Sequence, residues 1–123
     1  MQIWLWIAVG GAVGACARFG VNQWAVSVSG WPLATLLVNA IGSGSMGWMM
    51  GYYAPILATD SIKFAIIVGV LGSFTTFSTF SYETWVLLQQ GAWLKASLNI
   101  LCNVLLCLVM IAAGHAIGKF FTY

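Results

Sequence analysis

The sequence predicts an all-α membrane protein with four transmembrane helices, and three observations lead to that fold class. Hydrophobic residues make up 62% of the 123 residues, and charged residues only 5%. Soluble domains carry roughly 25% charged residues, so this chain has too few to cover a surface in water. Four apolar windows are each about as long as the roughly 20 residues that cross a bilayer as a helix. We therefore expect one domain, residues 1–123, embedded in the lipid bilayer.

The four expected spans follow one another closely. They cover about residues 3–24, 33–50, 62–89 and 94–120. The connections between them are short, at about 27–31, 53–61 and 90–93. The second span follows Pro32, which suits the first turn of a helix. The first span is not expected to be a cleaved signal peptide, because residues 1–10 lack the Lys or Arg of a positive n-region.

Glycine pairs four residues apart occur in three of the spans. They are Gly10 and Gly14, Gly47 and Gly51, and Gly114 and Gly118. Small residues at this spacing allow helix backbones to approach closely in lipid. Glycine is also common in membrane helices generally, but three repeats favour close packing of helices.

The basic residues divide evenly between the two expected sides of the membrane. With four spans, Lys63 and Lys119 lie on the side of both termini, and Arg18 and Lys95 lie on the other. The positive-inside rule then favours neither orientation. A protein without a preference can insert both ways, and two opposite copies can form an antiparallel, dual-topology homodimer. The net charge of +2, without any basic run, does not suggest a nucleic-acid partner.

The sequence contains no arrangement typical of an enzyme. It has one histidine, two acidic residues and no paired nucleophile and base. The three cysteines, Cys16, Cys102 and Cys107, lack the spacing of a metal site and lie in apolar segments. We expect them to be small packing residues.

The third span contains GSFTTFSTFSYE, residues 72–83, in which hydroxyl residues alternate with phenylalanine. This span is longer than a straight crossing needs, and Gly69 and Gly72 precede the hydroxyl run. Glycine weakens a helix, and serine or threonine hydroxyls bond backbone carbonyls and bend it. We therefore expect the third helix to be broken near residues 72–76. Such breaks line cavities and often form ion sites.

Several side chains near this break have two possible roles. Phe77 and Phe80 share a helix face, where they either pack or present their positive ring edges to a small anion. Asn39 and Arg18 are polar residues at membrane depth, where such residues are often functional. Hydrogen bonding between helices is the alternative for the asparagine.

Three motifs in order, GGAVGACAR, TLLVNAIGS and GVLGSFTTFSTFSYE, resemble the Fluc (CrcB) fluoride channels of bacteria. The four-span layout extends the resemblance over the whole chain. It implies an antiparallel, dual-topology homodimer in the bacterial inner membrane. Such a dimer has two fluoride pathways and passively exports cytoplasmic fluoride.

The resemblance also implies individual roles. The backbone carbonyls of Gly72 and Thr75 would hold a central structural sodium ion, and Arg18 would lie in an electropositive vestibule. The fluoride pathway would comprise Asn39, Phe77, Phe80, Ser78, Thr79, Ser81 and Glu83.

The chain departs from the family pattern at Ala34, where glycine is usual, and at Gly44, where an aromatic residue is frequent. Both departures indicate altered packing rather than lost function. In the fourth span, Ser97, Asn99 and Asn103 are only candidates for lining the pathway.

Two other functions compete with a fluoride channel. Small multidrug transporters are also four-span, dual-topology dimers, but they need an acid in the first span, and this one has none. A non-transporting membrane protein, such as a holin or an assembly subunit, would not need Asn39, the hydroxyl run and Glu83 at membrane depth.

Overall fold

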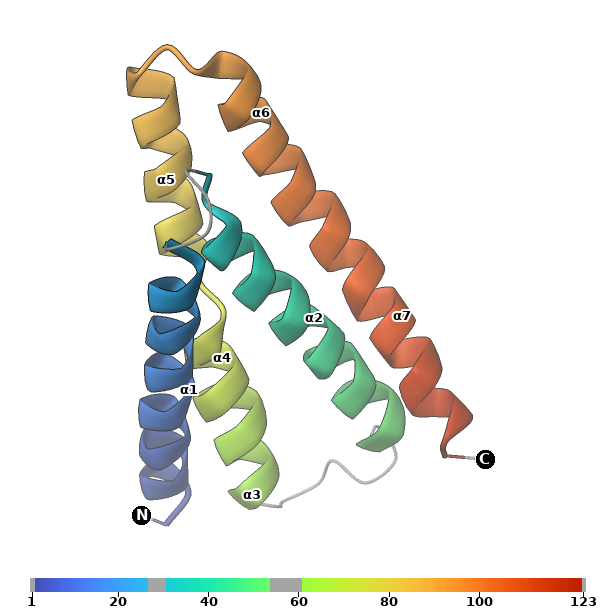
Figure 1. Ribbon diagram of the computed structural model, residues 1–123. Coiled ribbons are helices and arrows are strands. Elements are labelled where there is room, and N and C mark those ends of the chain that lie inside the picture. Colours follow the sequence, from blue (N-terminus) through green and yellow to red (C-terminus); the bar gives the residue numbers. More distant parts are fainter. Residues whose placement is uncertain (1, 27–30, 54–60, 123) are drawn as a thin grey trace.

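A computed structural model describes residues 2–26, 31–53 and 61–122, and these form four helical traverses (Figure 1). The first traverse is α1 (Gln2–Val26) and the second is α2 (Leu33–Tyr53). The third comprises α3 (Ser61–Phe64), a π-helical stretch (Ala65–Leu71), α4 (Gly72–Phe74) and α5 (Phe77–Gln89). The fourth comprises α6 (Trp93–Leu101), a second π-helical stretch (Cys102–Leu106) and α7 (Cys107–Phe120). All four lie within a few residues of the expected spans, and two of the expected connections fall largely outside the described residues.

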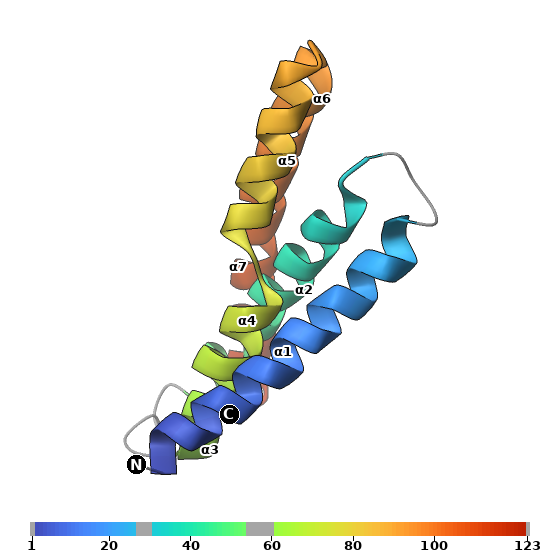
Figure 2. The same cartoon turned by 90° about the vertical axis from the view of Figure 1, so that its left-hand side faces the viewer.

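Successive traverses run in opposite directions, so the two termini lie at the same end of the molecule (Figure 1). Figure 2 shows α5 and α6 rising together as a hairpin, while α1 and α2 lean away from them. Lys63 in α3 and Lys119 in the last turn of α7 belong to the end with the termini. Lys95 lies in α6, next to the opposite end. Arg18 lies inside α1 rather than beyond its end, so the helix bounds assign it to one side of the membrane less directly than they assign the three lysines.

Three of the four traverses are long and apolar enough to cross a membrane by length and composition. Among the described residues these segments are Gln2–Ala25, Ser61–Gln89 and Trp93–Phe120. The second traverse, α2, is not one of them, because glycine, serine, asparagine and tyrosine lower its hydropathy. This helix instead lies centrally, with Thr35 and Val38 fully buried, and it contacts parts of all three other traverses. The protein is a multi-pass membrane protein with α2 packed among the others.

The predicted close packing at the glycine pairs is confirmed. All six glycines approach a neighbouring traverse so closely that an added Cβ would overlap a backbone carbonyl oxygen: Gly10 and Gly14 against the first π-helical stretch, Gly47 and Gly51 against α7, and Gly114 and Gly118 against α2. The carbonyl facing Gly114 is that of Gly44, so this departure from the family pattern lies in the contact between α2 and α7.

The cysteines differ from one another in burial. Cys102 and Cys107 are half-buried, as expected of packing residues, and all three thiols are free. Cys16 is exposed on α1, contrary to its predicted packing role.

Candidate functional site

The third traverse is interrupted by two threonines. Thr75 has φ −79° and ψ 156°, and Thr76 has φ −151° and ψ 117°, so both residues are extended between α4 and α5. Gly72 keeps helical dihedrals, φ −63° and ψ −31°. The interruption therefore begins later than the glycines of the motif suggest. β-Branched residues favour extended backbone, and two of them in succession occupy this position.

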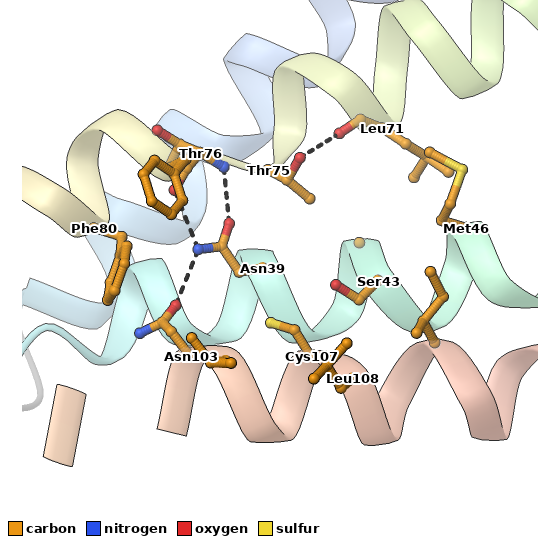
Figure 3. A pocket seen from close by; sticks show the side chains of 14 residues that line it. Asn39, Ser43, Met46, Leu71, Thr75, Thr76, Phe80, Asn103, Cys107 and Leu108 are labelled. Atoms are coloured by element: carbon orange, nitrogen blue, oxygen red, sulfur yellow. Dashed lines mark hydrogen bonds between the residues drawn. The ribbon is translucent and has the colours of Figure 1, made fainter. Parts of the chain in front are cut away.

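Asn39 replaces the hydrogen bonds that the backbone of Thr76 loses at the interruption (Figure 3). The Thr76 N–H donates to Asn39 Oδ1 at 2.8 Å, and Asn39 Nδ2 donates to the Thr76 carbonyl oxygen at 3.1 Å. Backbone groups buried in a membrane must be satisfied within the protein. The paired bonds from α2 therefore stabilise extended backbone at this depth.

The side chain of Thr76 caps the helix that follows. Its Oγ1 accepts a hydrogen bond from the Thr79 N–H at 3.2 Å and donates to Thr79 Oγ1 at 3.0 Å. Ser78 Oγ lies 3.3 Å from the same hydroxyl. Threonine is a favourable N-cap because its oxygen satisfies a free amide of the first turn. The hydroxyl run thus contributes directly to restarting the helix.

The hydrogen bonds to Asn39 and to the Thr76 hydroxyl occupy two backbone N–H groups that would otherwise donate to the carbonyls of Gly72 and Thr75. In an uninterrupted α-helix each carbonyl accepts from the N–H four residues later. Here the Thr76 N–H donates to Asn39, and the Thr79 N–H donates to the Thr76 hydroxyl. Carbonyls at unwound membrane helices coordinate Na⁺ in other proteins, so the two residues fit the predicted cation site.

A cavity of about 450 Å³ lies beside the interruption, between α2, the third traverse and the fourth (Figure 3). Four of the residues predicted to act at the site line it, namely Asn39, Thr75, Phe77 and Phe80. The other lining residues are Gly42, Ser43, Met46, Leu71, Thr76, Asn103, Val104, Cys107, Leu108 and Ile111. The cavity is thus largely apolar, with a small polar group around Asn39.

The two phenylalanines of the cavity form a contacting pair. The ring centroids of Phe77 and Phe80 are 5.4 Å apart, and the ring planes are inclined by 60°. Phe80 is 7% exposed, whereas Phe77 is 76% exposed. The spacing therefore places both rings on one face, but only Phe80 is packed within the chain.

The remaining predicted residues do not line this cavity. The Ser81 hydroxyl donates to the Phe77 carbonyl at 2.9 Å. Glu83 Oε1 accepts from the Thr35 hydroxyl at 2.8 Å, while Glu83 Oε2 is buried and, within the described structure, has no hydrogen-bond partner. Ser78 and Thr79 belong to the cap of α5, and Gly72 and Arg18 also lie outside the cavity lining.

Several residues at the site were not singled out from the sequence. Thr76 is the cap, Thr35 contacts Glu83, and Ser43 lines the cavity. The spacing in the sequence could have indicated two of them. Thr35 and Ser43 each lie four residues from Asn39 and thus share its helix face. Asn103, a candidate in the sequence, accepts a hydrogen bond from Asn39 at 3.0 Å and lines the cavity.

The family profile described as CrcB-like protein, Camphor Resistance (CrcB), matches residues 5–115. The chain belongs to the CrcB family. It is 44% identical over 117 residues to a protein of Aeromonas salmonicida named fluoride-specific ion channel FluC, covering 93% of this chain and 94% of that one. A protein of the same name from Shewanella woodyi is 45% identical over 113 residues, covering 90% and 91% of the two chains. The CrcB match covers the second and third traverses completely and most of the first and fourth, and it includes the interruption and the cavity.

Proposed function

We propose that this CrcB-family protein is a passive, fluoride-selective ion channel that exports cytoplasmic fluoride across the bacterial inner membrane. The observation that carries the proposal is the similarity, over at least 90% of each chain, to proteins named fluoride-specific ion channels. The protein is accordingly a channel and not an enzyme. Fluoride that enters a cell as neutral hydrogen fluoride ionises inside, and a passive pathway then lets the trapped anion leave.

The cavity supports a fluoride pathway past Phe77 and Phe80. Aromatic rings carry a positive edge, and ring edges that face an anion replace part of its hydration shell without closing the path. Asn39 brings polar groups to the same cavity. Ser78, Thr79, Ser81 and Glu83 extend the polar surface along α5, and Arg18 attracts anions at the vestibule.

The protein acts, in this proposal, as an antiparallel homodimer with two pathways. The even division of Lys and Arg is one support. The 76% exposure of Phe77 is a second, because a ring that contacts an anion on a pathway needs walls on more than one side. An opposite copy placed over the open side of the cavity supplies the missing wall.

The carbonyls of Gly72 and Thr75 would hold a structural sodium ion in the centre of that dimer. Two copies contribute four carbonyl oxygens. Both carbonyls lose their α-helical donors at the interruption, and the ion would compensate them electrostatically.

Efflux from liposomes that contain the purified protein tests the proposal against its competitors. We expect fluoride to leave down its concentration gradient when a potassium ionophore balances the charge, without a proton gradient. Proton-driven exchange of a cationic drug would instead identify a multidrug transporter. Transport of neither solute would favour a non-transporting membrane protein. Phe80→Ile, purified and reconstituted in the same way, provides the matched control. We expect this variant to lose most of the fluoride efflux of the parent protein.

A further inference from the structure

A series of side-chain hydrogen bonds leaves the interruption through Asn39 and crosses to the fourth traverse. Asn39 Nδ2 donates to Asn103 Oδ1 at 3.0 Å. Asn103 Nδ2 donates in turn to Asn99 Oδ1 at 3.1 Å, and also to the Asn99 backbone carbonyl at 3.1 Å. Asn39 and Asn103 thus each donate to the next amide in the series. The orientation of one amide therefore constrains that of its neighbour.

The series then returns to α5. Asn99 Nδ2 donates to Thr84 Oγ1 at 2.9 Å, and the Thr84 hydroxyl donates to the Phe80 carbonyl at 2.8 Å. At its other end, Asn39 Oδ1 accepts from the Thr76 N–H. The path therefore starts at the cap of α5 and ends on the backbone of the residue whose ring is buried in the cavity. We call Asn39, Asn103, Asn99 and Thr84 the amide relay.

The relay is buried along most of its length. Asn99 is fully buried, Asn103 is 5% exposed and Thr84 is 7% exposed. Ala96, one turn before Asn99, is also fully buried and leaves room for α5 to approach α6. Buried polar groups that are joined in a series support one another, and removal of one leaves its neighbours unpaired. Each relay member therefore influences the placement of the next.

We infer that the amide relay fixes the first turn of α5, and with it the ring of Phe80, in the position that the fluoride pathway requires. Asn99 and Thr84 do not line the cavity. They are positioning residues that act through Asn103 and through the Phe80 carbonyl. This inference rests on the proposed function, because it assigns a role to residues outside the pathway itself.

Fluoride efflux from liposomes tests the relay with variants of similar shape. Thr84→Val removes the hydroxyl that Asn99 needs and keeps the side-chain volume, so we expect efflux to fall about tenfold or more. Thr84→Ser keeps the hydroxyl and should retain efflux within about threefold of the parent. Thr122→Val is the matched control, because the Thr122 hydroxyl also donates to the carbonyl four residues earlier, at 3.0 Å, but does so at the end of α7. This control should conduct at the parent rate.

A double variant distinguishes a connected relay from independent contacts. Asn99→Leu should reduce efflux as Thr84→Val does, and the two changes together should cost little more than either alone, because residues in one network are not additive. Efflux that falls by the product of the two single effects would overturn the inference. So would parent-like efflux in Thr84→Val, or a loss of efflux in Thr84→Ser as large as the loss expected for Thr84→Val.

A spectroscopic measurement keeps the relay testable without transport. Thr84 is joined to Asn39 through the hydrogen bonds of Asn99 and Asn103. Loss of the Thr84 hydroxyl should therefore shift the side-chain amide resonances of Asn39 in NMR spectra of the protein in detergent, while Thr122→Val should not. Unchanged Asn39 resonances would contradict the relay. If the parent protein itself conducts no fluoride, the proposed function fails, and the resonances alone then decide whether the relay exists.

Discussion

Phe77 and Phe80 are one helical turn apart and in contact, but Phe77 is 76% exposed and Phe80 only 7%. A fully packed hydrophobic pair would place both rings inside the chain. The exposed ring is available to a second copy or to an anion, while the buried ring is held by its surroundings. Fluoride conduction therefore depends, in our proposal, on the chemistry of both rings and not on their volume alone.

Replacing either ring by isoleucine should slow fluoride efflux at least about tenfold, which corresponds to roughly 1.4 kcal/mol at the barrier. Isoleucine keeps an apolar side chain but lacks the positive edge of phenylalanine. Phe74→Ile should have a smaller effect, because Phe74 belongs to α4 and does not line the cavity. Liposome efflux measures the rates, and size-exclusion chromatography checks that each variant keeps its oligomeric state. Parent-like efflux in both Phe77→Ile and Phe80→Ile would mean that the pair only packs.

At the scale of helices, the sequence predicted where each helix begins and ends better than it predicted the contacts between helices. Hydropathy and Pro32 placed all four traverses within a few residues, because apolar length and helix-start signals are local properties of the chain. The interruption was expected over residues 72–76, and the extended residues are the last two of that range. The glycines indicate the start of the range, whereas the extended residues lie at its end, where Asn39 hydrogen-bonds the backbone of Thr76. A contact between residues so far apart in the sequence has no local signature.

The same reasoning explains why the site was predicted only in part. Asn39, Phe77 and Phe80 belong to sequence motifs in which polar and aromatic residues lie close together, and in the structure all three line one cavity. Thr84 and Thr35 are ordinary threonines in sequence, and their importance comes from partners on other helices, Asn99 and Glu83. Hydrogen-bond partners that lie on different helices can be identified only once the packing of the helices is known.

The close contact between α2 and α7 lets us predict how a methyl group added at a glycine changes the stability of the protein. A Cβ on Gly47 would overlap the Ile111 carbonyl oxygen, whereas one on Gly20 would have no atom within 4 Å. Gly47→Ala should therefore lower the free energy of unfolding by about 1–3 kcal/mol. Gly20→Ala should leave it unchanged or raise it by up to about 1 kcal/mol, because alanine is the better helix former. Thermal unfolding in detergent compares the two variants, and equal stability of both would contradict the close approach.

For the whole molecule, the balance of basic residues predicts that orientation limits activity. Two lysines added to the connection at 90–93 should force one orientation and abolish the activity of that variant expressed alone, because an antiparallel dimer needs both. Co-expression with a variant biased the other way should restore fluoride efflux. Normal conduction by the biased variant alone would rule out antiparallel pairing.

A sodium ion shared by two copies predicts that the assembly depends on the cation. Replacing sodium with a large organic cation should reduce fluoride efflux or dimer stability, since four carbonyl oxygens would then lack their ligand. Titration of efflux and of dimer content against sodium concentration measures the dependence. If neither quantity changes and no sodium is found in the purified protein, the central site is wrong.

The reversal potential of the purified protein in a planar bilayer is the most direct measurement of passive fluoride selectivity. With a tenfold fluoride gradient and equal chloride on both sides, a fluoride-selective channel should reverse at about 60 mV in magnitude, since a tenfold ratio is worth about 1.4 kcal/mol and 100 mV about 2.3 kcal/mol per charge. Inverting the gradient should invert the sign. A reversal potential near zero, or transport without any current, would contradict a passive fluoride-selective channel.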